Sequence, residues 1–333
     1  MRSTGAYAYT KACGIIGKSF VGKRIAALKL LKTLSEFERL VFSDKQRQPQ
    51  TVEEFKSLPF DLECRIEQRA VDQIFSIIDS FDEPPEVLLY QIRAYEYTDL
   101  KNCLHYILDG KKERPKIYDI GRFRTINFDA YPNINNMLKE TEFEFICDKI
   151  QNIKPHSIEF SRLEAQLDVQ YYKGLLKSLR NIYSDDKGIL SWMIREEISL
   201  KNCIWALRMR TYYKISTEEI AEYLTNKTEA IMSLELPLDF RDSWNEWKWK
   251  NFLNPQFSGQ KWKLDPRYFQ NAAANYLNKK AMRYFHVMPM TVTSIFCFIK
   301  IKQYEEDLLI SIVEGLSMGM GCSDIFKLLE IPV

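Results

Sequence analysis

The chain reads Tyr95-Glu96-Tyr97-Thr98-Asp99-Leu100-Lys101-Asn102-Cys103-Leu104 and later Arg195-Glu196-Glu197-Ile198-Ser199-Leu200-Lys201-Asn202-Cys203-Ile204, and both stretches contain the string Leu-Lys-Asn-Cys. The match lies at a shift of 100 positions, and self-similarity at a fixed spacing is typical of chains built from related structural units. A weaker third copy lies within Lys300–Ile312, where Asp307 takes the place of Asn202 at a shift of 105. The sequence therefore predicts three related units.

The spacing of the copies divides the chain into predicted helical units at residues 1–112, 113–212 and 213–333. The helices upstream repeat as well, because Leu62-Glu63 matches Leu163-Glu164 at a shift of 101. Clusters of Pro, Gly, Asp and Asn predict the breaks between helices. These clusters lie at Ser43–Gln50, Asp82–Pro85, Asp109–Pro115, Ser184–Gly188 and Asn254–Gly259.

Apolar residues recur with the 3.6-residue period of an α-helix in two segments, one from Leu28 to Val41 and one from Leu163 to Leu179. Patterns typical of strands are scarce, and the best of them, Val287–Ile295, fits a buried helix equally well. Gly and Pro number 12 each, whereas average usage would give about 40 together. We therefore predict an all-α fold of three pseudo-symmetric helical bundles.

Composition excludes several classes of protein. With 46% apolar residues the chain can bury a large core, and 47 Lys and Arg against 45 Asp and Glu argue against a nucleic-acid binder. Seven cysteines without a CxxC pair and three histidines predict neither a disulfide framework nor a zinc site, as in a reduced cytosolic protein. We expect no metal and no cofactor.

Membrane segments are not expected either. The N-terminus lacks the apolar region of a signal peptide, and Val287–Ile299 is too short for the roughly 18 apolar residues of a spanning helix. We find no lipidation signal and expect no cluster of four to eight basic residues that would bind anionic lipid. Any attachment to a membrane is therefore expected to use protein contacts.

The repeated string predicts two kinds of position. Leu100 and Leu200 lie one turn from apolar partners, so both are expected to be buried at equivalent places. The polar residues Asn102, Asn202 and Asp307 are interpreted as structural staples that hold backbone groups of a neighbouring helix. No nucleophile or base stands beside them, so we expect no catalytic site.

Paired carboxylates at Glu196-Glu197 and Glu305-Glu306 are interpreted as charge that faces solvent or a partner. Neighbouring residues on a helix diverge by about 100° and cannot share a proton.

Ala12–Ser19 has the form A-x-x-x-x-G-K-S, a relaxed P-loop pattern in which Lys18 would bind phosphates and Ser19 a magnesium ion. No apolar strand precedes it, so we interpret it as a glycine-interrupted helix start, with nucleotide binding kept as a further hypothesis.

Four tryptophans between Trp244 and Trp262 lie among basic residues and resemble a stacking platform for single-stranded nucleic acid. Acidic residues such as Asp242 and Glu246 dilute this charge, so helix packing is the favoured interpretation, with a protein-facing rim as the alternative.

At these repeats the chain resembles the C-type subunits of V-type ATPases, a family whose eukaryotic members are called d-type subunits. The family pattern of Glu, aliphatic residue, any residue, Asn and aliphatic residue is similar to Glu197–Ile204. Three further family features are similar to Tyr7-Ala8-Tyr9, to Leu163-Glu164 with Tyr171-Tyr172, and to Pro289 through Gly315. The chain departs from the pattern at Gly14–Ser19 and at Asp307.

The resemblance implies a funnel of three helical bundles that caps the membrane rotor ring and receives the foot of the central axle. The implied protein is a non-catalytic rotor subunit of a V-type ATPase that links ATP hydrolysis or synthesis to H⁺ or Na⁺ transport, peripheral on the cytoplasmic side of the membrane. Its implied partners are the proteolipid ring and the axle subunits of the soluble head. A helical-repeat scaffold unrelated to an ATPase is the alternative.

Overall fold

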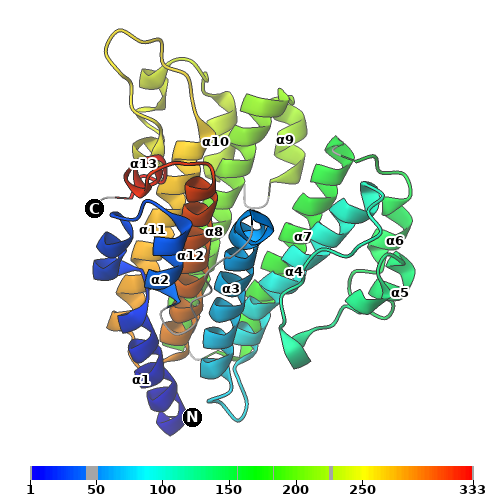
Figure 1. The fold of residues 1–333 in the computed structure, drawn as a ribbon. Helices are drawn as coiled ribbons and strands as arrows, with labels where there is room; N and C mark the ends of the chain where they lie inside the picture. The colour runs from blue at the N-terminus through cyan, green and yellow to red at the C-terminus, as the bar shows by residue number, and fades with distance from the viewer. Residues whose placement is uncertain (1, 43–51, 156, 183, 225–227, 332–333) are drawn as a thin grey trace. The chain divides into compact units, whose positions relative to one another are not determined.

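The computed structural model describes residues 2–42, 52–155, 157–182, 184–224 and 228–331. Within these ranges the chain is helical, with no strand, so the predicted all-α class is confirmed (Figure 1). None of the helices in the described ranges is long and apolar enough to cross a membrane. The predicted break at Ser43–Gln50 lies outside the described residues.

The chain forms two compact units. The first unit combines Met1–Asp82 with Glu196–Val333, and the second comprises Glu83–Arg195. This division follows compactness, whereas the predicted division into 1–112, 113–212 and 213–333 follows sequence repetition. The three-part division and the funnel therefore remain predictions.

The first unit is organised around long helices from both ends of the chain. Its elements are α1 (Arg2–Lys18), the 3₁₀ helix η1 (Gly22–Leu28), α2 (Leu34–Val41), α3 (Val52–Ile78), η5 (Met209–Tyr213), α9 (Thr217–Tyr223), α10 (Thr228–Glu235), η6 (Arg241–Trp244), η7 (Lys250–Phe252), α11 (Pro266–Val287), α12 (Val292–Ser317) and α13 (Cys322–Leu328). Helix α8 (Ser184–Arg208) crosses the boundary between the units in sequence.

The second unit pairs two long helices with shorter ones. Its elements are α4 (Glu86–Leu108), η2 (Gly121–Phe123), η3 (Phe128–Ala130), α5 (Ile134–Leu138), α6 (Phe145–Ile150), α7 (Ile158–Lys177) and η4 (Ser178–Asn181). Helices α4 and α7 approach closely at Gly174, where an added Cβ would lie 1.8 Å from the Tyr90 hydroxyl oxygen. Only glycine admits the Tyr90 ring at this position.

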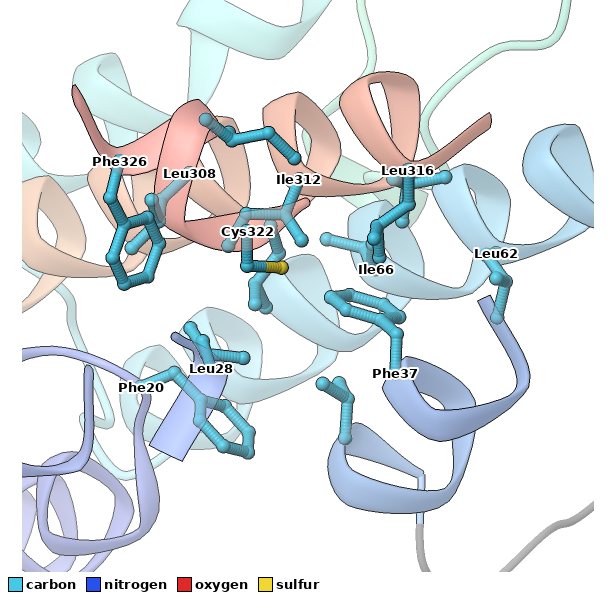
Figure 2. Close-up of a cluster of buried hydrophobic side chains, with 14 of the residues drawn as sticks. Phe20, Leu28, Phe37, Leu62, Ile66, Leu308, Ile312, Leu316, Cys322 and Phe326 are labelled. Atoms are coloured by element: carbon cyan, nitrogen blue, oxygen red, sulfur yellow. The ribbon is translucent and has the colours of Figure 1, made fainter. Parts of the chain in front are cut away.

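Helix α12 forms the centre of the first unit and packs against α11, α3 and α1. Thr291 begins it as N-cap, accepting a hydrogen bond from the Ser294 N–H at 3.3 Å. Toward its end, Leu308, Ile312 and Leu316 join an apolar cluster with side chains from η1, α2, α3 and α13 (Figure 2). The N-terminal and C-terminal parts of the chain therefore share one core.

Three local predictions were wrong. The periodic segment from Leu28 to Val41 is not one helix, because η1 ends at Leu28 and the Thr33 side chain caps α2. Ser184–Gly188 is not a break but the first turn of α8, where Asp185 and Asp186 favour the positive end of the helix dipole. Val287–Ile295 is neither a strand nor one helix, since α11 ends at Val287 and α12 begins at Val292.

Candidate functional site

The repeated string adopts the same pattern of burial in α4 and α8. Leu100 and Leu200 are both fully buried, which confirms the prediction for these two positions. Cys103 and Cys203, three residues further on, are fully buried as well, and burial raises the pKa of both thiols, that of Cys103 to about 12. Leu and Cys at i and i+3 thus make one apolar stripe in each copy.

The repeated polar residues lie nearer the surface. Asn102 is exposed and Asn202 is half-buried. Asp307 is exposed, yet the surrounding protein displaces enough water to raise the pKa of its carboxyl to about 6, against the opposite effect of Lys201 and Lys300. Whether the three residues hold the backbone of a neighbouring helix stays a prediction.

The acidic residues of the first repeat are buried anchors rather than surface charge. Glu96 is fully buried in α4, and its Oε1 accepts hydrogen bonds from the backbone N–H groups of Thr125 and Ile126 at 2.5 and 2.8 Å. Asp99, one turn later, accepts from the Tyr118 N–H at 3.1 Å. Together they fix the loop that follows α4 onto the helix.

Glu196 and Glu197 have the same anchoring role in the first unit. Glu196 lies 3.2 Å from the Lys248 ammonium and accepts a hydrogen bond from the Tyr276 hydroxyl at 3.1 Å. Glu197 pairs with Lys300 of α12 at 2.8 Å. The interpretation of this carboxylate pair as solvent-facing or partner-facing charge was therefore wrong.

A buried ion pair connects α1 to α12. Lys302 and Glu305 are each only 2% exposed and contact each other one turn apart on α12. The Glu305 carboxylate accepts the Phe20 N–H at 2.5 Å, and the Lys302 ammonium donates to the Ser19 hydroxyl at 3.3 Å. Burial lowers the pKa of Lys302, and Glu305 opposes that shift. Because each ion has a partner and further hydrogen bonds, the pair fixes how α1 meets α12.

The second predicted carboxylate pair, Glu305-Glu306, is therefore not surface charge either. Glu306 is buried along with Glu305, at 5% and 2% exposure. The interpretation of both pairs failed for the same reason, since each carboxylate has neighbours that the local sequence does not contain.

The geometry around Ser19 excludes a P-loop at Ala12–Ser19. The segment is not a loop, because Gly14, Gly17 and Lys18 belong to the continuous helix α1. It is also the end of that helix and not a helix start, as the sequence predicted. The buried Ser19 hydroxyl donates to the Ile15 carbonyl and accepts from Lys302, so it does not face a nucleotide-bound metal ion.

The tryptophans are core residues, which confirms the packing interpretation. The Trp244 indole N–H donates to the Pro237 carbonyl at 2.8 Å, and that of Trp247 donates to the Glu229 carbonyl at 3.0 Å. Buried rings cannot stack on nucleic-acid bases. The buried members of the group are Trp244, Trp247, Trp249 and Trp262.

Among the described residues, no group of His, Cys, Asp or Glu side chains is arranged to hold a metal ion. The cysteines are free thiols. The distinctive chemistry of the site is therefore mechanical: buried carboxylates and one buried ammonium tie helices to one another and to the segments between them. The sequence did not reveal these ties, because the partners lie as far apart as Phe20 and Glu305.

Comparison with known proteins gives two findings. Residues 26–326 match the model of the family described as ATP synthase (C/AC39) subunit. A protein of Treponema pallidum (strain Nichols), named only as an uncharacterized protein, is 23% identical over 324 residues, which cover 94% of this chain and 92% of that protein. Both alignments extend over nearly the whole chain.

Proposed function

Because this chain belongs to the ATP synthase (C/AC39) subunit family, we propose that it is the central-stalk rotor subunit of a V-type ion-translocating ATPase. Members of the family are structural subunits of V/A-type ATPases and not catalytic ones. In the proposed role, the chain is a socket between the central axle and the membrane rotor ring. The observation that carries the proposal is the family match over residues 26–326.

The proposed partners are the proteolipid ring on one side and the axle subunits of the soluble head on the other. The chain would lie on the cytoplasmic side of the membrane and be held there by the complex. The transported ion is chosen by the carboxylate of the ring, so the proposal is the same for H⁺ and Na⁺.

A protein that transmits torque must resist twisting, and the ties within the first unit supply that resistance. Helix α12 has 26 residues, which gives a rod of about 39 Å at 1.5 Å per residue. The Lys302–Glu305 pair connects this helix to the end of α1, and the Glu197–Lys300 pair connects it to α8. Buried, geometrically fixed contacts transmit force because they have one arrangement and no slack.

No chemical step is assigned to the chain. Its proposed contribution to ATP hydrolysis or synthesis is to transmit rotation. A scaffold unrelated to an ATPase, the alternative considered from the sequence, is disfavoured by membership of this family.

The test is binding to the isolated ring. We expect the purified chain to sediment with ring reconstituted in vesicles of neutral lipid, through an interface of at least about 1,000 Å², and not with the same vesicles without ring. Equal recovery with and without the ring, in neutral lipid, would contradict the proposal.

A further inference from the structure

A basic patch lies between α1 and α2. It consists of Lys18, Lys23, Arg24, Lys29 and Lys32, all of them exposed, and no Asp or Glu occurs from residue 18 to residue 35. The expectation that the chain has no cluster of four or more basic residues was therefore wrong. The overall net charge of +2 conceals the patch because acidic residues elsewhere balance it.

The helix that carries the patch directs its charges outward. A 3₁₀ helix has three residues per turn, so side chains three apart in sequence share a face. One face of η1 ends in the buried Leu28, whereas the next carries Lys23, Ala26 and Lys29, all exposed. The third face carries Arg24 and Ala27 and continues to Leu30 beyond the helix end.

The patch is held in place by the core beneath it. Phe20 and Leu28 are buried in the apolar cluster shared with α12 and α13 (Figure 2). The Leu31 carbonyl accepts a hydrogen bond from the Cys322 N–H at 3.4 Å. The Arg24 guanidinium donates to the Lys18 carbonyl. These contacts fix the segment, so its lysines form a defined surface.

An apolar side chain projects from the same surface. Leu30 is 81% exposed and stands between Lys29 and Lys32 in the sequence. Basic residues with a projecting leucine are the composition of segments that lie in the interface of an anionic membrane, where the charges meet headgroups and the apolar group enters the acyl boundary. We propose that the basic patch and Leu30 bind the anionic lipid surface beside the rotor ring.

The composition of the patch favours lipid over an acidic protein. Four of its five cations are lysines, which act as mobile point charges suited to a diffuse anionic surface, whereas protein interfaces are enriched in arginine and depleted in lysine. The nearest carboxylate in sequence, Glu36, accepts the Lys32 N–H at 2.8 Å and so belongs to the start of α2.

This inference deepens the proposed function and rests on it for the presence of a membrane. A contact with fluid lipid does not fix an angle of rotation, so it is compatible with a turning rotor. Its role would be to hold the chain near the membrane plane while the ring supplies the specific contact.

The experiment measures sedimentation of the full chain with vesicles that contain no ATPase subunits. We expect binding to phosphatidylcholine vesicles containing phosphatidylserine, loss of that binding in 0.5 M salt, and little binding to phosphatidylcholine alone. In the variant Lys23→Gln/Lys29→Gln/Lys32→Gln, the partition coefficient should fall about 100-fold, because each basic residue contributes about fivefold near an anionic surface.

The control variant is Lys173→Gln/Lys177→Gln/Lys279→Gln, which removes the same charge from exposed lysines elsewhere. It should bind anionic vesicles like the wild type, and thermal melting should show that both variants are folded. Equal losses in the two variants, failure of the wild type to bind anionic vesicles, or equally tight binding to duplex DNA would overturn the proposal. Binding to the ring in neutral lipid should be unchanged in the patch variant, which separates this inference from the proposed function.

Discussion

Leu100 and Leu200 are the residues through which the sequence repeat can be tested directly. Both are fully buried, so Leu100→Asp or Leu200→Asp would place a carboxylate without a cationic partner in the core. We expect each to lower the free energy of unfolding by about 3–5 kcal/mol. Urea denaturation measures this loss.

The matched control is Leu200→Met, which keeps volume and apolar character and should cost less than about 1.5 kcal/mol. If both Leu→Asp variants unfolded at the wild-type urea concentration, the two positions would not be equivalent core sites.

Asp307 gives a prediction for the dependence of stability on pH. Its pKa is about 6 in the folded chain and about 3.9 when unfolded, so the folded state binds more protons between these values. Stability contributed by this group is therefore full below about pH 4 and lost as pH rises to about 6. Solvent screening at this exposed side chain limits the effect to less than about 1 kcal/mol.

Asp307→Asn should thus raise the melting temperature at pH 7.5 and leave it nearly unchanged at pH 4. It also restores the Asn that occurs at positions 102 and 202. Asp82→Asn, at an exposed carboxylate, serves as the control with no such difference. A lower melting temperature for Asp307→Asn at pH 7.5 would show that the carboxylate stabilises the fold.

The repeated leucines could be predicted from the sequence, but the anchoring carboxylates could not. An apolar residue at helical spacing indicates its burial through its near neighbours. A buried Glu does so only through a partner far away in the sequence, such as Lys248 for Glu196 or Phe20 for Glu305. Charge alone therefore made these residues look exposed.

At the scale of elements, helix α1 decides between a P-loop and a helical end. Gly14 lies within the helix and an added Cβ would meet nothing within 4 Å. Because Gly is less favourable than Ala by about 1 kcal/mol in a helix interior, Gly14→Ala should stabilise the chain by about 0.5–1 kcal/mol in thermal unfolding.

Gly5, in the same helix, is the contrasting control, since an added Cβ would lie 2.9 Å from the Met290 carbonyl oxygen. Gly5→Ala should destabilise. Micromolar binding of ATP that disappears in Lys18→Ala, together with destabilisation by Gly14→Ala, would contradict the helical account and restore the nucleotide hypothesis.

The pairing of α4 with α7 depends on Gly174. Gly174→Ala would bring its Cβ into the Tyr90 ring, and we expect a loss of about 1–3 kcal/mol from this overpacking. Removing the ring in the double variant Gly174→Ala/Tyr90→Ala should cost less than the sum of the two single changes. Strict additivity in urea denaturation would mean that the two residues do not meet.

Helices were predictable as a class, whereas some of their ends were not. Periodicity located α7, but it extended α2 backward across a turn, because apolar residues of η1 and α2 enter the same cluster at nearly helical spacing. The cap at Thr33 was the available signal for the true start. At Ser184–Gly188, acidic residues typical of loops also suit the first turn of a helix.

At the scale of the whole molecule, net charge and its distribution lead to different conclusions. A value of +2 argues against a polyanion-binding protein in general, yet it hid the five cations between residues 18 and 32. The all-α class could be predicted from the shortage of Gly and Pro together with helical periodicity. Which distant segments tie the helices together required the structure.

The central claim is that the chain transmits rotation without performing chemistry. The most direct measurement compares ATP hydrolysis with ATP-driven ion uptake in proteoliposomes that carry the complete ATPase, with and without this protein. We predict that the head still hydrolyses ATP when the protein is omitted, that ion uptake is lost, and that adding the purified chain restores uptake. Undiminished ion uptake without the protein, or loss of hydrolysis by the isolated head, would contradict the account.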